Sequence, residues 1–287
     1  MLRAEAGVIV LVNLGLADLM TEPSVSSERA SQVLLGEAAT LLTRGDDWVE
    51  LRLERDGYVG WVRAVAILEC GAERARAYRA ACGTVVTAEI APAFLEAERR
   101  SNAGKLPFGV RLPLVERRGD TVALELPDGR TWWVAASDTT LAAELPRPDA
   151  GGIAAALAWM RRSVGVPYLW GGCSPFGYDC SGLTQAFWAT LGVRIPRDAD
   201  QQFRAGEPVE GSTRAGDLLF FSSNATPGER ARHADIRHVA IALGGDQILH
   251  ASGRMRTVTV DLLAPGRSAH GDWLLQNSAG ARRYACS

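Results

Sequence analysis

Short alternations of apolar and polar residues fill the first part of the chain. The segments "TLL", "WVELRL" and "GYVGWVRA" alternate with the period of half-buried strands. Glycine-containing turns at 36–37, 44–46 and 56–57 separate them. Strands this short, with a turn about every 8 to 12 residues, are typical of small barrels and sandwiches. The pattern therefore predicts an all-β module over residues 7 to about 68.

The same pattern returns further along the chain. "VELRLERDGYVGWVRA" and "VALELPDGRTWWVAAS" both contain a strand, an Asp-Gly turn and an aromatic strand with Trp-Val, at an offset of about 70 residues. Residues 69–82, "ECGAERARAYRAAC", have a helical composition without strand alternation, and predict a helical connector. We therefore expect a second all-β module over 83–145. The Pro- and Gly-rich segment 145–152 is expected to be a linker.

The pattern changes after residue 153. "IAAALAWMRRSVG" predicts a helix, and "CSGLTQAFWATLG" predicts a second one, with Leu183, Phe187 and Leu191 on one face and a glycine at its end. The segments "GDLLFFS", "HVAIALGG" and "DQILHASG" follow as strands. Helices followed by antiparallel strands predict an α+β domain.

Length, composition and charge narrow the class of protein. A chain of 287 residues favours two or three domains, and 47% hydrophobic with 22% charged residues is an ordinary globular balance. A net charge of -2 gives no broad attraction to nucleic acid or anionic membrane. Asn13 and Asp18 interrupt the apolar run 7–20, and Glu5 cancels the charge of Arg3 before it. We therefore expect a buried strand there, rather than a secretion signal or membrane span.

The cysteines argue against a disulfide framework. An odd number at irregular spacing suits a reducing compartment, so we expect a cytoplasmic protein. The five are Cys70, Cys82, Cys173, Cys180 and Cys286.

Cys180 has the strongest sequence signal for chemistry. It stands where the predicted helix 180–191 begins, and the free N–H groups and dipole of that end favour a thiolate with a lowered pKa. Cys173 lies in the preceding loop and gains no such help. Buried packing of Cys180 and a Cys173–Cys180 disulfide remain alternatives.

Two histidines complete a possible catalytic row. His238 opens the strand "HVAIALGG" and His250 closes the strand "QILHAS", so a tight antiparallel hairpin would bring them to the same end. Cys180 could then attack, His238 take its proton, and His250 orient His238. A zinc site formed by these residues with Cys173 is a weaker alternative, because C-x6-C is not a usual zinc spacing.

Four blocks in this order, "PYLWGG", "YDCSGL", "RHVAIALG" and "ILHAS", resemble the NlpC/p60 family of bacterial cell-wall cysteine peptidases. The resemblance covers about residues 150 to 280. It implies that Cys180 is the nucleophile, His238 the base and His250 the third, polar member. It also implies that no metal or organic cofactor is needed.

The N-terminal half resembles the bacterial SH3-like domain that precedes some members of this family. The resemblance implies two small all-β SH3-like barrels, over 1–68 and a diverged copy over 83–145, joined by a helical connector over 69–82. A papain-like α+β NlpC-type catalytic domain over 150–287 follows. Two such domains before a peptidase resemble the γ-D-glutamyl-L-diamino-acid endopeptidases of murein-peptide recycling, which act on small free peptides with an unblocked N-terminal L-Ala.

A free ammonium group of a substrate needs a carboxylate and hydroxyl groups to bind it. Asp179 can supply the charge, with Ser181 and Tyr168 as hydrogen-bond partners. Asp179 could instead cap the helix, and Tyr168 could simply pack. The resemblance implies substrate binding at these positions. It also implies that Arg197 pairs with a peptide carboxylate, and that Glu22 and Tyr58 of the first SH3-like domain line the same cleft.

The sequence thus favours a cytoplasmic peptidase that cuts the γ-D-Glu–diamino acid bond of murein tripeptides or tetrapeptides. We expect no nucleic-acid or membrane partner. A hydrolase of intact exported peptidoglycan and a wall-binding protein with an inactive peptidase domain remain alternatives. Residues 222–237 are long for the family and could form a lid or a disordered loop. His233, within them, and His270 are expected at the surface.

Overall fold

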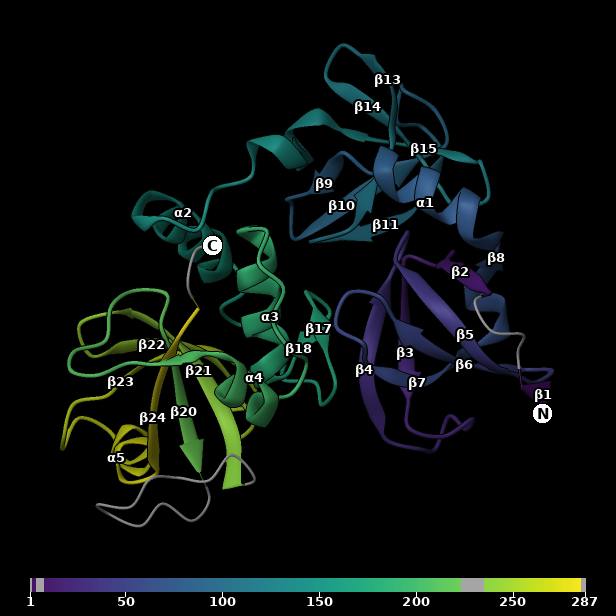
Figure 1. Ribbon diagram of the computed structural model, residues 1–287. Coiled ribbons are helices and arrows are strands. Elements are labelled where there is room, and N and C mark those ends of the chain that lie inside the picture. Colours follow the sequence, from purple (N-terminus) through teal and green to yellow (C-terminus); the bar gives the residue numbers. More distant parts are fainter. Residues whose placement is uncertain (1, 4–7, 223–234, 285–287) are drawn as a thin grey trace. The chain divides into compact units, whose positions relative to one another are not determined.

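The structure is a computed structural model that describes residues 2–3, 8–222 and 235–284. The chain divides into two compact units, Met1–Leu145 and Pro146–Ser287 (Figure 1). Within the described residues, no helix is long and apolar enough to cross a membrane.

The first unit begins with an antiparallel sheet of order β4-β3-β7-β6-β5-β2-β8, with β1 paired to β5. The predicted alternation is confirmed, because alternate residues of β6 and β7 are buried in its core. Its strands are β1 (Leu2–Arg3), β2 (Ile9–Val12), β3 (Leu16–Met20), β4 (Arg29–Leu34), β5 (Ala38–Arg44), β6 (Trp48–Leu53), β7 (Val59–Arg63) and β8 (Ile67–Glu69).

The apolar run 7–20 forms two strands rather than the single buried strand that we expected. β2 and β3 are separated by residues 13–15. Asn13 Nδ2 donates a hydrogen bond to Asp128 Oδ2 at 3.0 Å, so the polar residue that interrupts the run also breaks the strand.

The helix predicted over 69–82 is α1 (Gly71–Ala81). Its Tyr78 hydroxyl donates to the Glu125 carbonyl oxygen at 2.8 Å. A five-stranded sheet of order β11-β10-β15-β14-β13 and a three-stranded sheet of order β12-β9-β16 follow. Their strands are β9 (Thr84–Val86), β10 (Ile90–Phe94), β11 (Asn102–Pro107), β12 (Arg111–Leu112), β13 (Leu114–Arg118), β14 (Thr121–Glu125), β15 (Thr131–Ala135) and β16 (Thr139–Leu141).

The internal repeat read from the sequence is visible in the backbone. β7 leads into the short 3-10 helix η1 (Ala64–Ala66) and β8, and β15 leads likewise into η2 (Ala136–Asp138) and β16. Trp61 pairs with Met20 across one sheet, and Trp133 pairs with Phe94 across the other. The two segments therefore repeat the same strand, 3-10 helix and strand order.

The second unit is α+β, as predicted. A six-stranded antiparallel sheet of order β19-β24-β20-β21-β22-β23 lies beside helices, and α3 contacts both β21 and β22 (Figure 1). Its helices are α2 (Ala150–Arg161), α3 (Cys180–Thr190), α4 (Ala199–Ala205) and α5 (Ala269–Gln276). Its strands are β17 (Cys173–Ser174), β18 (Gly177–Tyr178), β19 (Glu207–Pro208), β20 (Leu218–Ser222), β21 (Ile236–Gly244), β22 (Gln247–Ser252), β23 (Thr257–Leu262) and β24 (Ser278–Arg283).

Helix α2 starts three residues earlier than the pattern predicted, inside the expected linker 145–152. Asp149 caps it by accepting a hydrogen bond from the Gly152 N–H at 2.9 Å. An Asp before an apolar helix is a start signal that outweighs the glycines after it.

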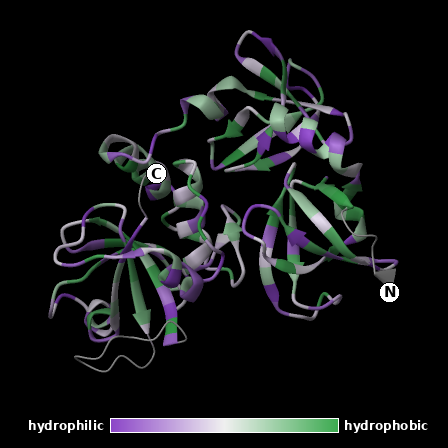
Figure 2. Cartoon of the chain, viewed as in Figure 1, coloured by the Kyte–Doolittle hydropathy of each residue, from purple (hydrophilic) through white to green (hydrophobic). Residues whose placement is uncertain are grey.

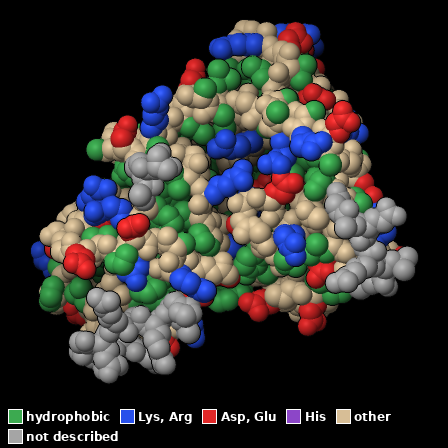
Figure 3. Space-filling model, viewed as in Figure 1, with side chains coloured by type: hydrophobic (Ala, Val, Ile, Leu, Met, Phe, Trp, Pro, Cys, Tyr) green, Lys and Arg blue, Asp and Glu red, His purple; other side chains and the backbone are tan. Residues whose placement is uncertain are grey.

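Hydropathy and charge are distributed as in an ordinary globular protein. Hydrophobic residues follow the strands that form the cores (Figure 2). Acidic and basic side chains both occur on the face shown in Figure 3.

Candidate active site

Cys180 is the first residue of α3, where the sequence placed it. Asp179 is the N-cap, and its Oδ1 accepts a hydrogen bond from the Gly182 N–H at 2.6 Å. The cysteine is only 8% exposed. Backbone hydrogen bonds from Val239 and Ser181 reach its sulfur, so the sulfur lies beside β21, next to His238 in sequence.

The thiol of Cys180 does not have the lowered pKa that we expected from its position on the helix. Burial, and then the negative charge of Asp179, raise the pKa of Cys180 to about 12, although the two backbone hydrogen bonds oppose them. Loss of solvation therefore outweighs the helix dipole here. The resting nucleophile is a neutral thiol, and its proton must leave as it attacks.

His238 and His250 lie together, as the hairpin predicted. His238 Nε2 and His250 Nδ1 are 2.7 Å apart, and the ring planes meet at 69°. His238 is positioned on β21 opposite Phe221 of β20. Burial and the positive charge that His250 could carry hold the pKa of His238 well below its ordinary value, so the imidazole is neutral at pH 7.

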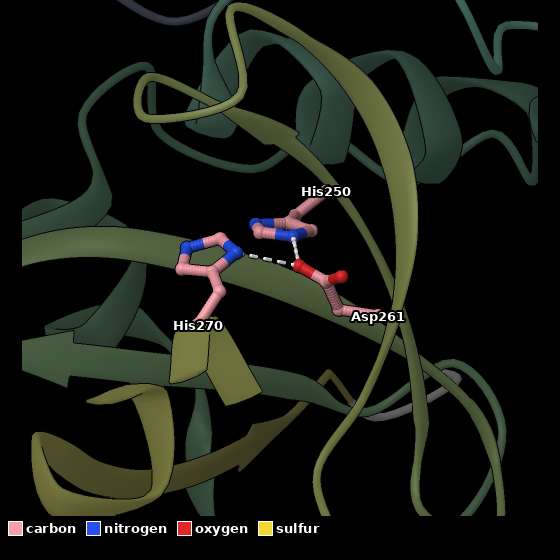
Figure 4. A group of neighbouring side chains, drawn as sticks. All are labelled: His250, Asp261 and His270. Atoms are coloured by element: carbon pink, nitrogen blue, oxygen red, sulfur yellow. Dashed lines mark hydrogen bonds and ion pairs between the residues drawn. The ribbon is translucent and has the colours of Figure 1, made fainter. Parts of the chain in front are cut away.

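Asp261 on β23 extends this pair, and sequence reasoning missed it. His250 Nε2 lies 2.9 Å from Asp261 Oδ2 (Figure 4). A carboxylate accepts only, so His250 carries its hydrogen on Nε2 and accepts at Nδ1 from His238 Nε2–H. The Nδ1 atom of His238 is then left to accept the thiol proton. The hydrogen bond from His250 is also the main cause that lowers the pKa of Asp261.

His270 was expected at the surface, and that expectation was wrong. Its side chain is 12% exposed, and Nδ1 lies 2.8 Å from Asp261 Oδ2. The imidazole and the carboxylate are therefore within ion-pair distance of one another. The ring stacks on His250 at 5.6 Å because α5 covers that end of the sheet. His233 and most of the long segment 222–237 lie outside the described residues.

Asp179 and Arg197 form a buried ion pair beside the nucleophile. Arg197 Nη2 lies 2.6 Å from Asp179 Oδ2, and Nη1 lies 3.1 Å from Oδ1. Nη1 also donates to the Ser181 hydroxyl at 2.8 Å. Arg197 is 1% exposed, and Asp179 is its ion-pair partner. Its pairing with a peptide carboxylate stays a prediction.

Gln202 on α4 belongs to the same buried network and was not identified from the sequence. Its amide donates to the Ser181 carbonyl oxygen at 3.1 Å and to the Pro196 carbonyl oxygen at 2.8 Å. Its carbonyl oxygen accepts from the Thr184 hydroxyl at 2.7 Å. These contacts fix the first turn of α3 against the segment that carries Arg197.

Tyr168 lies close enough to the nucleophile for the two groups to interact electrostatically. Burial, and then the Cys180 and Asp179 charges, raise the pKa of Tyr168. The Arg256 guanidinium lies 5.8 Å above its ring. Glu22 and Tyr58 belong to the first unit, where Glu22 is exposed and Tyr58 packs on the barrel core. Their role at the cleft stays a prediction.

The structure tests the disulfide and zinc alternatives for Cys173 and Cys180. Cys173 and Cys180 are not joined by a disulfide. Among the described residues, the only group of three or more candidate metal-ligand atoms is His250, Asp261 and His270, so the zinc set with both cysteines does not assemble. Cys173 pairs with Tyr178 in the β17–β18 hairpin.

Cysteine peptidases use a thiol beside a histidine whose tautomer is fixed by further polar side chains. This chain has such a thiol at a helix start, and a second histidine and a carboxylate fix the tautomer of the histidine beside it. Residues 165–271 match the NlpC/P60 family, and residues 19–67 match the bacterial dipeptidyl-peptidase Sh3 domain. The chain is therefore a cysteine peptidase with an NlpC/P60 domain that follows a bacterial SH3 domain.

Similar proteins share this arrangement over most of their length. A γ-D-glutamyl-L-lysine dipeptidyl-peptidase of Bacillus cereus is 27% identical over 268 residues, which cover 88% of this chain and 74% of that protein. The Bacillus subtilis protein of the same name is 28% identical over 80% of this chain and 74% of its own. The crystal structure of an NlpC/P60 family protein from Bacillus cereus has the same fold, with a TM-score of 0.80 at 24% identity over 96% of this chain and 99% of that one.

Proposed function

We propose that this protein is an endopeptidase that hydrolyses the bond between γ-D-Glu and a diamino acid in murein-derived tripeptides or tetrapeptides with a free N-terminal L-Ala. Relatives named γ-D-glutamyl-L-lysine dipeptidyl-peptidase match the chain across both units. The observation that carries the proposal is the chain of hydrogen bonds His238–His250–Asp261 beside the start of α3. It prepares a neutral imidazole to accept the proton of Cys180.

The reaction proceeds through an acyl-enzyme. Cys180 Sγ attacks the γ-carbonyl carbon of D-Glu while its proton passes to His238 Nδ1. The thiol and imidazole are both neutral at rest, so attack and proton transfer occur together. Backbone N–H groups at the start of α3 stabilise the oxyanion. His238 then protonates the leaving amine, activates a water molecule, and the L-Ala-γ-D-Glu dipeptide is released.

The free amine of L-Ala binds beside Asp179, Ser181 and Tyr168. Arg197 already pairs with Asp179, yet the charge of Asp179 affects the pKa of both Cys180 and Tyr168 more strongly than that of Arg197 does. At both groups the charge of Asp179 therefore acts more strongly than that of Arg197, and in this proposal it stabilises the ammonium group. Arg197 acts by holding the carboxylate in place. Glu22 and Tyr58 of the first unit remain candidate substrate-binding residues in this proposal.

The fold around this site is a papain-like α+β domain after two SH3-like barrels. The second barrel, within 83–145, is supported by the repeated order of strand, 3-10 helix and strand, and by the matching positions of Trp61 and Trp133. We place the protein in the cytoplasm, where recycled murein peptides are free. The odd number and irregular spacing of the cysteines in the sequence support this location.

Hydrolysis of intact peptidoglycan is the second candidate. A Mycobacterium tuberculosis protein named peptidoglycan endopeptidase RipB is 35% identical over 137 residues, which cover 42% of this chain and 53% of that protein. The match is confined to one part of the chain, whereas the dipeptidyl-peptidases match most of it. This difference favours the small free peptide as substrate.

A mass-spectrometric assay separates the candidates. L-Ala-γ-D-Glu-meso-diaminopimelate, its lysine analogue and their N-acetylated forms are incubated with wild type and Cys180→Ala. Cleavage of the free peptides only, by wild type only, supports the proposal. Equal cleavage of the acetylated forms removes the amine pocket. If only intact sacculi are cleaved, the second candidate is correct, and if nothing is cleaved, sedimentation with sacculi tests a wall-binding role.

A further inference from the structure

Three side chains from three elements bring possible metal-ligand atoms together on the side of His250 that faces away from His238. They are His250 on β22, Asp261 on β23 and His270 in the first turn of α5. One donor atom from each lies within 4.8 Å of the others. Figure 4 shows both imidazoles directed at the same carboxylate oxygen, at the 2.9 and 2.8 Å given above.

We propose that this cluster binds a divalent zinc-type cation, and that the bound cation switches the peptidase off. The inhibitory part rests on the proposed roles of Cys180 and His238. Two imidazole nitrogens and one carboxylate oxygen suit zinc, which accepts three protein ligands and a water molecule. Magnesium and calcium prefer oxygen ligands, so this set selects against them.

The donor atoms lie near the spacing of a tetrahedral site. Bonds of about 2.0–2.1 Å in a tetrahedral site place neighbouring donor atoms about 3.3 Å apart. The two nitrogens lie 2.9 and 2.8 Å from Asp261 Oδ2, so each must move away from it by a few tenths of an ångström. The two nitrogens lie within 4.8 Å of one another, so they must approach by at most about 1.5 Å. The His250 side chain is fully buried, whereas Asp261 is 19% and His270 12% exposed. A cation therefore enters from the Asp261 and His270 side.

The charge at the cluster favours a cation moderately. Asp261 supplies one negative charge, and the imidazoles bind metal in their neutral form. The Arg254 guanidinium also acts on His270, and it opposes a cation there. We therefore expect a reversible regulatory site rather than a permanently filled structural one.

A metal ion bound at this site would reverse the direction of the hydrogen bond between His250 and His238. A metal on His250 Nε2 displaces the hydrogen from that atom, so neutral His250 carries it on Nδ1. His250 Nδ1–H then donates to His238 Nε2, and the hydrogen of His238 moves to Nδ1. The number of protons on the two rings is unchanged. His238 Nδ1 can no longer accept the thiol proton, and acylation stops.

Binding is tested without substrate, so that its outcome is independent of the proposed function. The full-length Cys180→Ala protein is titrated with zinc chloride alone by calorimetry, which removes the nucleophilic thiol as a ligand. We expect one site, and a loss of affinity on the order of 100-fold in Cys180→Ala/His270→Gln. The glutamine amide can donate a hydrogen bond to Asp261 but ligates zinc poorly. Cobalt(II) bound at this site should show no thiolate-to-metal charge-transfer band.

Inhibition is then measured on the active enzyme. Zinc should abolish wild-type cleavage, a chelator should restore it, and His270→Gln should need on the order of 100-fold more zinc while keeping its zinc-free rate. Equal zinc affinity with and without His270, or binding that disappears with Cys180, would overturn the site. Binding without inhibition would overturn the switch. If the proposed function fails instead, the calorimetric result on His270 still stands.

Discussion

Within the C-terminal unit, the Arg197 guanidinium contacts both carboxylate oxygens of Asp179, the residue that precedes the nucleophile Cys180. The two contacts are 2.6 and 3.1 Å long, and the same carboxylate accepts the N–H groups of Gly171 and Gly182. One ion pair therefore fixes the helix start, the preceding loop and the position of Cys180. This makes Asp179 both a cap and a source of negative potential, rather than one or the other.

Removal of Arg197 should destabilise the protein strongly. Arg197→Met leaves the Asp179 carboxylate buried without its partner, which typically costs about 3–5 kcal/mol. Urea unfolding followed by fluorescence measures the loss. Arg204→Met is the matched control, because its pair with Asp200 is exposed and should contribute less than about 1 kcal/mol. Equal losses from the two variants would contradict the assigned role.

Asp261→Asn should reduce kcat with little change in KM. The amide can donate to His250 Nε2 and so favour the wrong tautomer of His250. We expect a loss of roughly 10- to 100-fold, smaller than the loss of about 10²–10⁴-fold from His238→Ala, which removes the base itself. His250→Ala should also lose less activity than His238→Ala. Steady-state kinetics on the free tripeptide gives the order, and the reverse order would exchange base and orienter.

Local patterns predicted most of this site. The helix start at Cys180 and the hairpin that joins His238 to His250 both depend on residues close in sequence. Asp261 lies on the next strand along, where a single carboxylate in "TVTVDL" was an available signal. His270 gave no such signal, because α5 brings it to Asp261 through tertiary packing alone.

Burial explains why the sequence did not show the electrostatic surroundings of Cys180. A lowered pKa for Cys180 follows from the helix start, but the sequence does not show that the thiol is enclosed. The sequence also does not place Arg197 next to Asp179. Both depend on contacts between α3 and the segment after it, which spacing and periodicity do not encode.

Cys173→Ser should keep most of the activity. Cys173 lies in the short β17–β18 hairpin, and a hydroxyl there preserves the backbone pairing with Tyr178. Cys180→Ser is the matched control and should lose nearly all cleavage, because a serine hydroxyl is a far weaker nucleophile than a thiol. The mass-spectrometric assay compares both with wild type. A folded but inactive Cys173→Ser protein would show that Cys173 takes part in catalysis.

Alkaline pH should destabilise wild type more than Cys180→Ser. The unfolded thiol ionises near 9.0, whereas burial raises the folded pKa to about 12. The folded state therefore holds a proton that the unfolded state releases, so this stability is present below pH 9 and is lost as pH rises toward 12. The slope should differ by up to about 1.4 kcal/mol per pH unit. Urea unfolding at several pH values measures it, and parallel curves would exclude a buried neutral thiol.

At low pH the lowered pKa of His238 should be visible in the activity of the enzyme. The folded pKa of His238 lies well below 6.5, so the base stays neutral at pH values where an ordinary histidine is protonated. The acid limb of kcat/KM should therefore lie below pH 6.5, and activity should fall as pH drops through the folded pKa. An acid limb at or above 6.5 would show that burial does not dominate at His238.

Gly182→Ala should displace the loop over the active-site helix. A Cβ at Gly182 would lie 2.1 Å from the Gly172 carbonyl oxygen, and backbone at that distance must move. Gly172 also accepts the Asp179 N–H, so the movement reaches the residue before the nucleophile. Gly151→Ala in α2 is the control, because its Cβ would meet its nearest neighbour at 3.5 Å and should stabilise the helix by up to about 1 kcal/mol. We expect Gly182→Ala to lower both the unfolding free energy and kcat, whereas Gly151→Ala keeps kcat. If both variants were equally active and stable, close packing at Gly182 would not be what positions Cys180.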